Sequence, residues 1–232
     1  MNDLFINMDS YTIWTILLGF IWVIAYLSKV LSYKKMLLMG LVLLPFGLTQ
    51  AYFVPGFWHV SVNEQFSSIR DIGSFLWIFF LGGIAAVLFE SVFRLRKSAS
   101  LKPTKKSNKN TLIIYFLLII SGVIATAIQW FTSLSVTRGA LIMGFVIIWY
   151  VGITERKMLR EVVYGALLFG SLYIMSLYVV DWLFPQFLTT HLSSNQTLGY
   201  ILTIPIEEYL YAIVFGAACV PIYRGLRSSE TK

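Results

Sequence analysis

Long apolar runs without charged residues recur along this chain, and they limit its fold more than any other feature. A helix rises about 1.5 Å per residue, so roughly 20 apolar residues cross a hydrocarbon core about 30 Å thick. Because 58% of the 232 residues are hydrophobic and only 12% are charged, much apolar surface must face lipid. The sequence therefore predicts an all-α membrane protein with about seven transmembrane helices. The runs lie at approximately residues 11–27, 36–53, 72–89, 111–131, 139–153, 162–184 and 199–222.

The distribution of basic residues predicts the orientation. Of the 18 Lys and Arg residues, all but Arg70 and Arg138 follow the first, third, fifth or seventh run. Since Lys and Arg stay on the cytoplasmic side, we expect the N-terminus outside and the C-terminus inside. Asp3 and Asp9, rather than basic residues, precede the first run, which favours a true span over a cleaved signal peptide. The net charge of +7 is spread over separate loops, which favours contact with anionic lipid headgroups and not with nucleic acid.

A basic stretch over residues 94–110, rich in Ser and Asn, is expected to be a cytosolic linker between two related halves. We expect a first three-helix repeat at 1–93, a linking transmembrane helix at 111–131 and a second three-helix repeat at 132–232. Each repeat would cross the membrane three times, and the linking helix would restore the direction. Both repeats would then start outside and end inside, which makes them parallel. The last helices of the repeats align at a constant offset of 134, which matches Phe75-Leu76-Trp77 with Tyr209-Leu210-Tyr211, Gly82 with Gly216, and Phe89 with Tyr223.

Two adjacent carboxylic acids, Glu207 and Glu208, fall inside the seventh run. Counted from Gly199, their positions are roughly 12 to 13 Å along a helix axis. Neighbouring helical positions diverge by about 100°, so we expect the two carboxyls to point in different directions. Burial disfavours ionisation and the two charges repel, so at least one carboxyl is expected to be protonated near neutral pH. A protonated carboxyl in an apolar pocket is a proton donor, and ionisable groups inside a membrane are candidates for function.

The neighbours of this pair complete the candidate site. Thr203 would lie one helical turn before Glu207. Pro205 lacks an N–H, which would free the carbonyl of Ile201 and kink the helix.

Most of the aromatic residues, which make up 16% of the chain, are expected to be lipid anchors or packing. Trp77, Tyr209 and Tyr211 are the best placed to present ring faces to a developing cation. Asp71 lies near the end of a predicted span, where a solvated or interfacial acid is expected.

Three classes of polytopic membrane protein require residues that this chain lacks. A retinal protein needs a lysine inside its last span, and every lysine here is predicted in a loop or tail. A glutamate-type intramembrane protease needs an arginine where this chain has Ala212, together with membrane histidines, whereas His59 and His191 fall in predicted external loops. A polytopic prenyltransferase needs aspartate-rich motifs for magnesium, and none is present. We expect no metal site and no cofactor.

The motif Pro205-Ile206-Glu207-Glu208-Tyr209-Leu210-Tyr211 resembles the Pro-x-Glu-Glu-x-x-Phe motif of the lycopene cyclase domain family of bacterial and fungal membrane proteins, with Tyr211 in place of the final Phe. As a pattern of spans, the resemblance covers nearly the whole chain. It implies a multi-pass protein of the bacterial cell membrane that acts on a lipid-dissolved polyene such as lycopene. Membrane lipids and a homo- or hetero-oligomeric partner are the other expected contacts.

The resemblance also implies a reaction, a non-redox cyclisation of lycopene to a product of the β- or γ-carotene type. A proton adds to an end-group double bond, the carbocation attacks internally, and loss of another proton leaves a ring. Glu207 or Glu208 would donate the proton, and the other would position it or accept the proton lost later. Tyr211, Tyr209, Trp77, Pro205 and Thr203 would contact the substrate.

The first repeat departs from this pattern. Gly73 and Ser74 stand at the positions aligned with Glu207 and Glu208, and Asp71 is the nearest auxiliary acid. Two other classes of function therefore stay open. One is a non-catalytic carotenoid-binding or subunit-assembly module, and the other is a small proton-coupled transporter.

Overall fold

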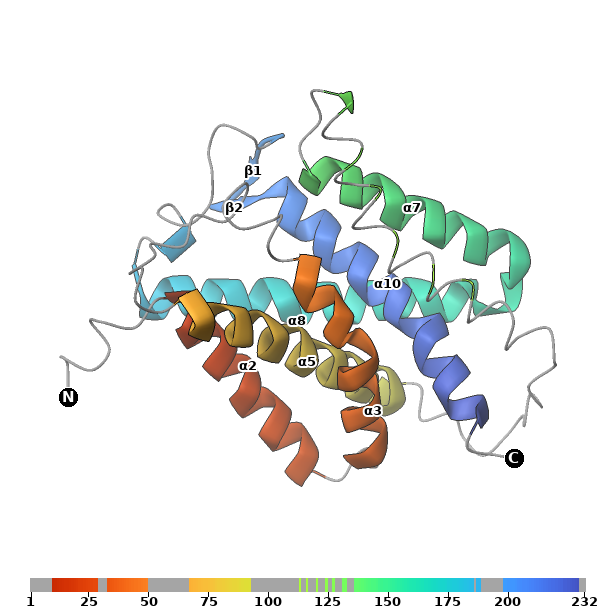
Figure 1. Cartoon of the computed structure of the whole chain (residues 1–232), viewed down its shortest axis with the longest axis horizontal. Coiled ribbons are helices and arrows are strands. Elements are labelled where there is room, and N and C mark those ends of the chain that lie inside the picture. The colour runs from red at the N-terminus through yellow and green to blue at the C-terminus, as the bar shows by residue number, and fades with distance from the viewer. Residues whose placement is uncertain are drawn as a thin grey trace.

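The computed structural model describes residues 10–28, 33–49, 67–92, 136–185, 187–188 and 198–229, together with isolated positions between 113 and 132. Within the described part of the N-terminal half there are three helices, namely α2 (Ser10–Leu27), α3 (Tyr33–Leu43) with its 3-10 continuation η1 (Leu44–Thr49), and α5 (Ser67–Val92). In the other half, α7 (Val136–Thr154) leads through η3 (Arg156–Met158) into α8 (Leu159–Leu183). A short antiparallel hairpin of β1 (Tyr200–Ile201) and β2 (Ile204–Pro205) precedes α10 (Ile206–Ser229) (Figure 1).

The helices have the lengths and compositions that a membrane requires. Within the described residues, three helical segments are long and apolar enough to cross a bilayer, at Ile72–Phe89, Leu159–Leu183 and Ile206–Arg224. Two shorter apolar helices cover Thr12–Leu27 and Gly144–Thr154. The structure thus agrees with an all-α membrane protein. The predicted linker and most of the linking helix lie outside the described residues, so the seven spans and their orientation stay predictions.

Prolines set several of the helix boundaries. At Pro45, the α-helix α3 gives way to the tighter η1, because proline cannot donate its N–H. The helix α8 ends at Leu183, two residues before Pro185.

The start of α10 differs from the predicted span, which began at Gly199. Pro205 disfavours a helical conformation at Ile204, so the helix starts only at Ile206, after the hairpin. Glu207 and Glu208 therefore lie in the first helical turn, and the expected depth of 12 to 13 Å along the helix is wrong. The predicted kink at Pro205 and the position of Thr203 one helical turn before Glu207 are also wrong, because both residues belong to the hairpin.

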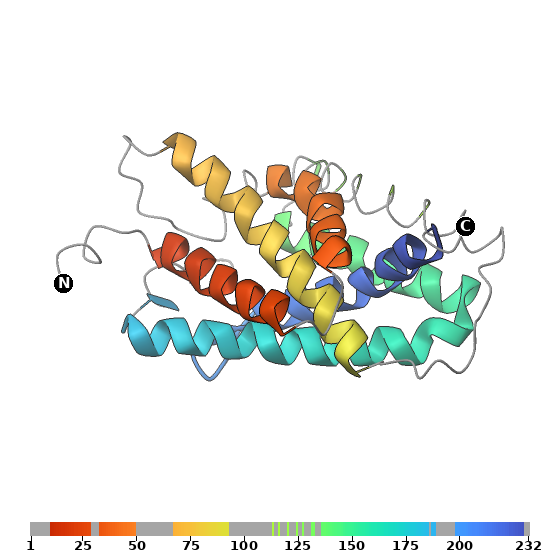
Figure 2. The same ribbon diagram turned by 90° about the horizontal axis from the view of Figure 1, so that it is seen from below.

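The last described helix of each half packs against two helices that precede it. The helix α5 packs against α2 and α3, and α10 packs against α7 and α8. Figure 1 shows α7 running beside α10, and Figure 2 shows α2 beside α5. Contacts also join α5 with α8, α3 with α10, and α5 with α10. Buried residues of both halves form one continuous hydrophobic core.

Residues that align at the offset of 134 lie against each other where α5 meets α10. The rings of Trp77 and Tyr211 stack with centroids 6.4 Å apart, and Phe89 meets Tyr223 edge to face at 5.2 Å. Two parallel repeats related by an axis between α5 and α10 would produce such contacts. The division into repeats itself stays a prediction.

Glycines allow the closest helix approaches in both halves. A Cβ on Gly82 would lie 3.3 Å from the Cα of Gly40 in α3. A Cβ on Gly216 would lie only 2.7 Å from the carbonyl oxygen of Gly165 in α8. Because lipid and side chains are equally apolar, such tight packing is a main source of helix association in a membrane.

Candidate functional site

Both glutamates of the motif are buried, with Glu207 only 1% and Glu208 only 3% exposed. Glu208 faces α8, where the hydroxyl of Tyr173 donates a hydrogen bond of 2.7 Å to its Oε2. Glu207 faces the segment before the hairpin, where the backbone N–H of Leu198 donates a bond of 2.6 Å to its Oε1. The two carboxyls thus point toward different elements, as neighbouring helical positions require.

The hairpin fixes the start of the helix that carries the pair. The N–H of Ile206 donates to the carbonyl of Gly199 at 3.0 Å, which closes the base of the hairpin. Gly199 has a φ of +151°, a conformation that side chains disfavour. The first turn of α10 is therefore held next to Leu198, the donor to Glu207.

One carboxyl oxygen of the acidic pair has no hydrogen-bond partner in the described part of the chain. Glu207 Oε2 is buried and has no hydrogen bond among the residues that the structure describes. Buried polar atoms in proteins are nearly always paired, so an unpaired carboxyl oxygen is a position where a proton or a ligand atom would be stabilised.

Aromatic rings from both halves surround Tyr173. Its ring centroid lies 6.3 Å from that of Trp77 and 5.8 Å from that of Tyr211. Trp14 of α2 contacts both Tyr173 and Trp77 at 5.3 Å. The indole N–H of Trp14 donates to Ser176 Oγ at 3.1 Å, and Ser176 donates to the carbonyl of Tyr173 at 2.7 Å. We call Trp14, Trp77, Tyr173 and Tyr211 the aromatic cluster.

The structure brings some of the predicted site residues together and leaves others apart. Trp77 and Tyr211 belong to the aromatic cluster beside Glu208. Tyr209 instead shares a hydrogen bond of 3.1 Å with Tyr178 and donates to the carbonyl of Ile201 at 3.3 Å. Thr203 is exposed in the hairpin turn, and Pro205 is buried in β2. The side chain of Asp71 lies outside the described residues.

Sequence reasoning missed Tyr173, Trp14 and Ser176. A tyrosine inside an apolar span needs a partner for its hydroxyl, and this requirement was the one available signal for Tyr173. No spacing in the sequence connects Trp14 with residues of α8, because only the packing of the two halves brings them together.

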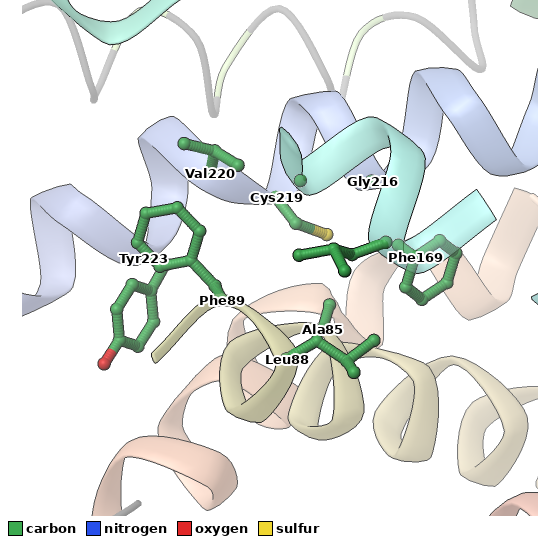
Figure 3. Close-up of a pocket in the computed structure, with 10 residues that line it drawn as sticks. Ala85, Leu88, Phe89, Phe169, Gly216, Cys219, Val220 and Tyr223 are labelled. Atoms are coloured by element: carbon green, nitrogen blue, oxygen red, sulfur yellow. The ribbon is translucent and has the colours of Figure 1, made fainter. Parts of the chain in front are cut away.

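A separate apolar crevice lies between α5, α8 and α10, nearer the C-terminal end of α10 (Figure 3). The empty space in and around this crevice is about 270 Å³, part of which is open to the outside. Phe169 lines the crevice and also stacks on Tyr173 with centroids 6.1 Å apart, so the crevice adjoins the aromatic cluster. Cys219 and Tyr223 are the titratable residues of its lining, and no carboxyl takes part.

Fold and site together define a helical, membrane-suited protein with a buried acidic pair beside an aromatic cluster. The family model described as lycopene cyclase matches residues 131–226, which include α7, α8, the hairpin and most of α10. This region is similar to the lycopene cyclase family, and it carries Tyr173, Glu207 and Glu208. Trp14 and Trp77 lie outside the matched region. No curated protein and no solved structure matches the chain.

Proposed function

We propose that this protein is a carotenoid end-group cyclase that closes the ends of a linear, lipid-dissolved polyene such as lycopene. The observation that carries the proposal is the buried Glu208, bonded to Tyr173 against the aromatic cluster, within the region that matches the lycopene cyclase family. An acid removed from water and surrounded by ring faces is what a carbocation reaction needs.

Glu208 is the proton donor in this proposal, because its partner Tyr173 belongs to the aromatic cluster. A neutral carboxyl can accept the tyrosine hydroxyl at one oxygen and carry its proton on the other. Transfer of this proton to the end-group double bond leaves a carboxylate and a tertiary carbocation. An internal double bond of the same substrate then supplies two electrons to the cation, which forms the ring bond and moves the positive charge into the ring.

Glu207 accepts the proton that the ring carbon loses. Its Oε2 is buried and has no partner among the described residues, whereas Oε1 is fixed by Leu198. One proton enters the substrate and one leaves, so the product is an isomer and no redox partner is required. Before the next turnover Glu207 must release this proton and Glu208 must regain one.

The aromatic cluster stabilises the positive charge between these two proton transfers. Attraction between a cation and a ring face is about 0.5 to 2 kcal/mol for each ring, and it is strongest where water is excluded. Trp77 is 3% and Tyr173 is 1% exposed, so water does not compete at these rings.

The test is expression in a bacterium that accumulates lycopene, followed by pigment analysis. We expect the unchanged chain to convert lycopene into ring-containing products and both Glu208→Gln and Glu207→Gln to stop the conversion. Glu161→Gln is the matched control, because Glu161 forms an ion pair with Arg224 outside the aromatic cluster. Lycopene left unchanged by folded, membrane-inserted protein would refute the proposal, and conversion by both motif variants would remove the two glutamates from the reaction.

A further inference from the structure

The hairpin beside Glu207 turns apolar side chains outward. Leu198 is 58% exposed and Leu202 is 82% exposed, and Tyr200 and Ile201 are each 48% exposed. Ile204, on the opposite strand, is fully buried. The hairpin therefore has one apolar side against the protein and a second apolar side facing its surroundings.

This outward side continues an exposed apolar stripe on α8. Met175, Val179 and Trp182 are 67%, 42% and 80% exposed, and their spacing places them on one face of the helix. The helix α8 is long and apolar enough to cross a bilayer, so lipid is the natural contact of this stripe. Tyr209 joins α10 to the hairpin through Ile201 and to α8 through Tyr178, so stripe and hairpin are adjacent.

The backbone of the hairpin is prepared for an apolar environment. Strand pairing matches Tyr200 with Pro205 and Ile201 with Ile204. The N–H of Ile206 binds the carbonyl of Gly199, and the carbonyl of Ile201 also accepts the Tyr209 hydroxyl. Each unpaired backbone polar group is costly in lipid, so these bonds lower the cost of placing the hairpin at the membrane.

The tip of the hairpin carries a residue type that is unusual in a tight turn. Leu202 has a φ of +56°, a region where glycine or asparagine is the common choice. The chain thus carries the most exposed apolar side chain of the hairpin at a position where a large apolar residue is unfavourable in water. Insertion of the tip into lipid would compensate for this.

From these observations we infer that residues 198–205 form a lipid-inserted flap over Glu207, and that bilayer lipid is the partner of its outward side. Displacement of the flap would withdraw the N–H of Leu198 from Glu207 and open a path from the hydrocarbon phase to the acidic pair. The lipid contact stands independently, whereas the role in substrate entry rests on the proposed cyclase function.

Lipid contact is tested by fluorescence quenching in phosphatidylcholine vesicles. Cys219, the only cysteine of the chain, is replaced by alanine, and a single cysteine is introduced by Leu202→Cys and labelled with an environment-sensitive dye. Trp182→Cys serves as the lipid-facing reference, and Arg156→Cys, exposed between α7 and α8, serves as the water-facing reference. We expect spin-labelled lipid to quench the dye at position 202 as strongly as at position 182. Quenching by aqueous iodide instead, as at position 156, would overturn the inference.

The entry role is tested by Leu202→Lys, with Leu159→Lys, an exposed apolar position at the start of α8 and outside the flap, as the control. A charge at the apolar tip should raise the KM for membrane-dissolved lycopene and leave kcat unchanged, whereas the control should retain both. A loss of kcat with an unchanged KM would contradict entry through the flap. If the unchanged chain has no cyclase activity, the proposed function fails while the quenching result stands. If it is active but position 202 is in water, the flap fails alone.

Discussion

Replacing Tyr173 by phenylalanine removes a single hydroxyl from the site and keeps the ring in the aromatic cluster. That hydroxyl is the donor to Glu208 Oε2 at 2.7 Å, and both residues are almost fully buried. A buried hydrogen bond to a carboxyl contributes about 1 to 3 kcal/mol. If this bond persists in the transition state, its loss should lower kcat/KM by about 5- to 150-fold, since each 1.4 kcal/mol is a factor of ten.

The matched control for this change is Tyr178→Phe. The hydroxyl of Tyr178 pairs with that of Tyr209 at 3.1 Å and has no part in the bond to Glu208. Removal of a hydroxyl at such a partly exposed position changes free energies by about 0.5 kcal/mol, which corresponds to a roughly twofold change in rate. Purified variants should be compared in vesicles with dissolved lycopene, with rates normalised to the monodisperse, folded fraction. Equal activity of Tyr173→Phe and the unchanged protein, or equal impairment of both variants, would refute the reasoning.

Three further predictions concern helix packing, the ion pair between Glu161 and Arg224, and the flap. Gly216→Ala should lower the thermal midpoint in detergent by the equivalent of about 1 to 3 kcal/mol, because its Cβ would lie 2.7 Å from a backbone carbonyl of α8. Gly73→Ala, whose Cβ meets nothing within 4 Å, should not lower it. A double-mutant cycle of Glu161→Gln and Arg224→Gln should give a coupling of about 0.2 to 1 kcal/mol, since the ion pair is only partly buried; zero coupling would exclude a stabilising role. Leu202→Gly should relieve about 1 to 2 kcal/mol of backbone strain and still reduce lycopene conversion, and a fall in the thermal midpoint would contradict the strain.

The helices could be predicted because their signal is local. Each run of apolar residues long enough for a span predicts a helix whatever its neighbours do, and α5 and α8 lie where the runs 72–89 and 162–184 predicted helices. The start of α10 could not be found in this way. Apolar residues before Pro205 continue the run, and hydrophobicity alone does not separate a hairpin strand from a helical turn.

Of the candidate site, only the acidic half could be predicted from the sequence. Two adjacent glutamates in an apolar run are visible in the sequence, because ionisable groups there are rare. Their partners depend on tertiary packing, since Tyr173 lies on another helix and Trp14 in the other half of the chain. The offset of 134 did align Trp77 with Tyr211, but an alignment of two sequences does not predict that the aligned rings touch.

The different starts of α5 and α10 explain why the two aligned helices need not carry the same chemistry. Ser74 aligns with Glu208, yet α5 begins at Ser67 and α10 begins at Ile206, so only Glu208 lies in a first helical turn. A glutamate at the position of Ser74 would instead lie about two turns into α5, away from the free N–H groups of the helix start. The N–H of Leu198 at the base of the hairpin binds Glu207, so the hairpin and the acidic pair form one structural unit. The first half contributes the rings of Trp14 and Trp77 instead, which favours a single acidic centre with walls from both halves.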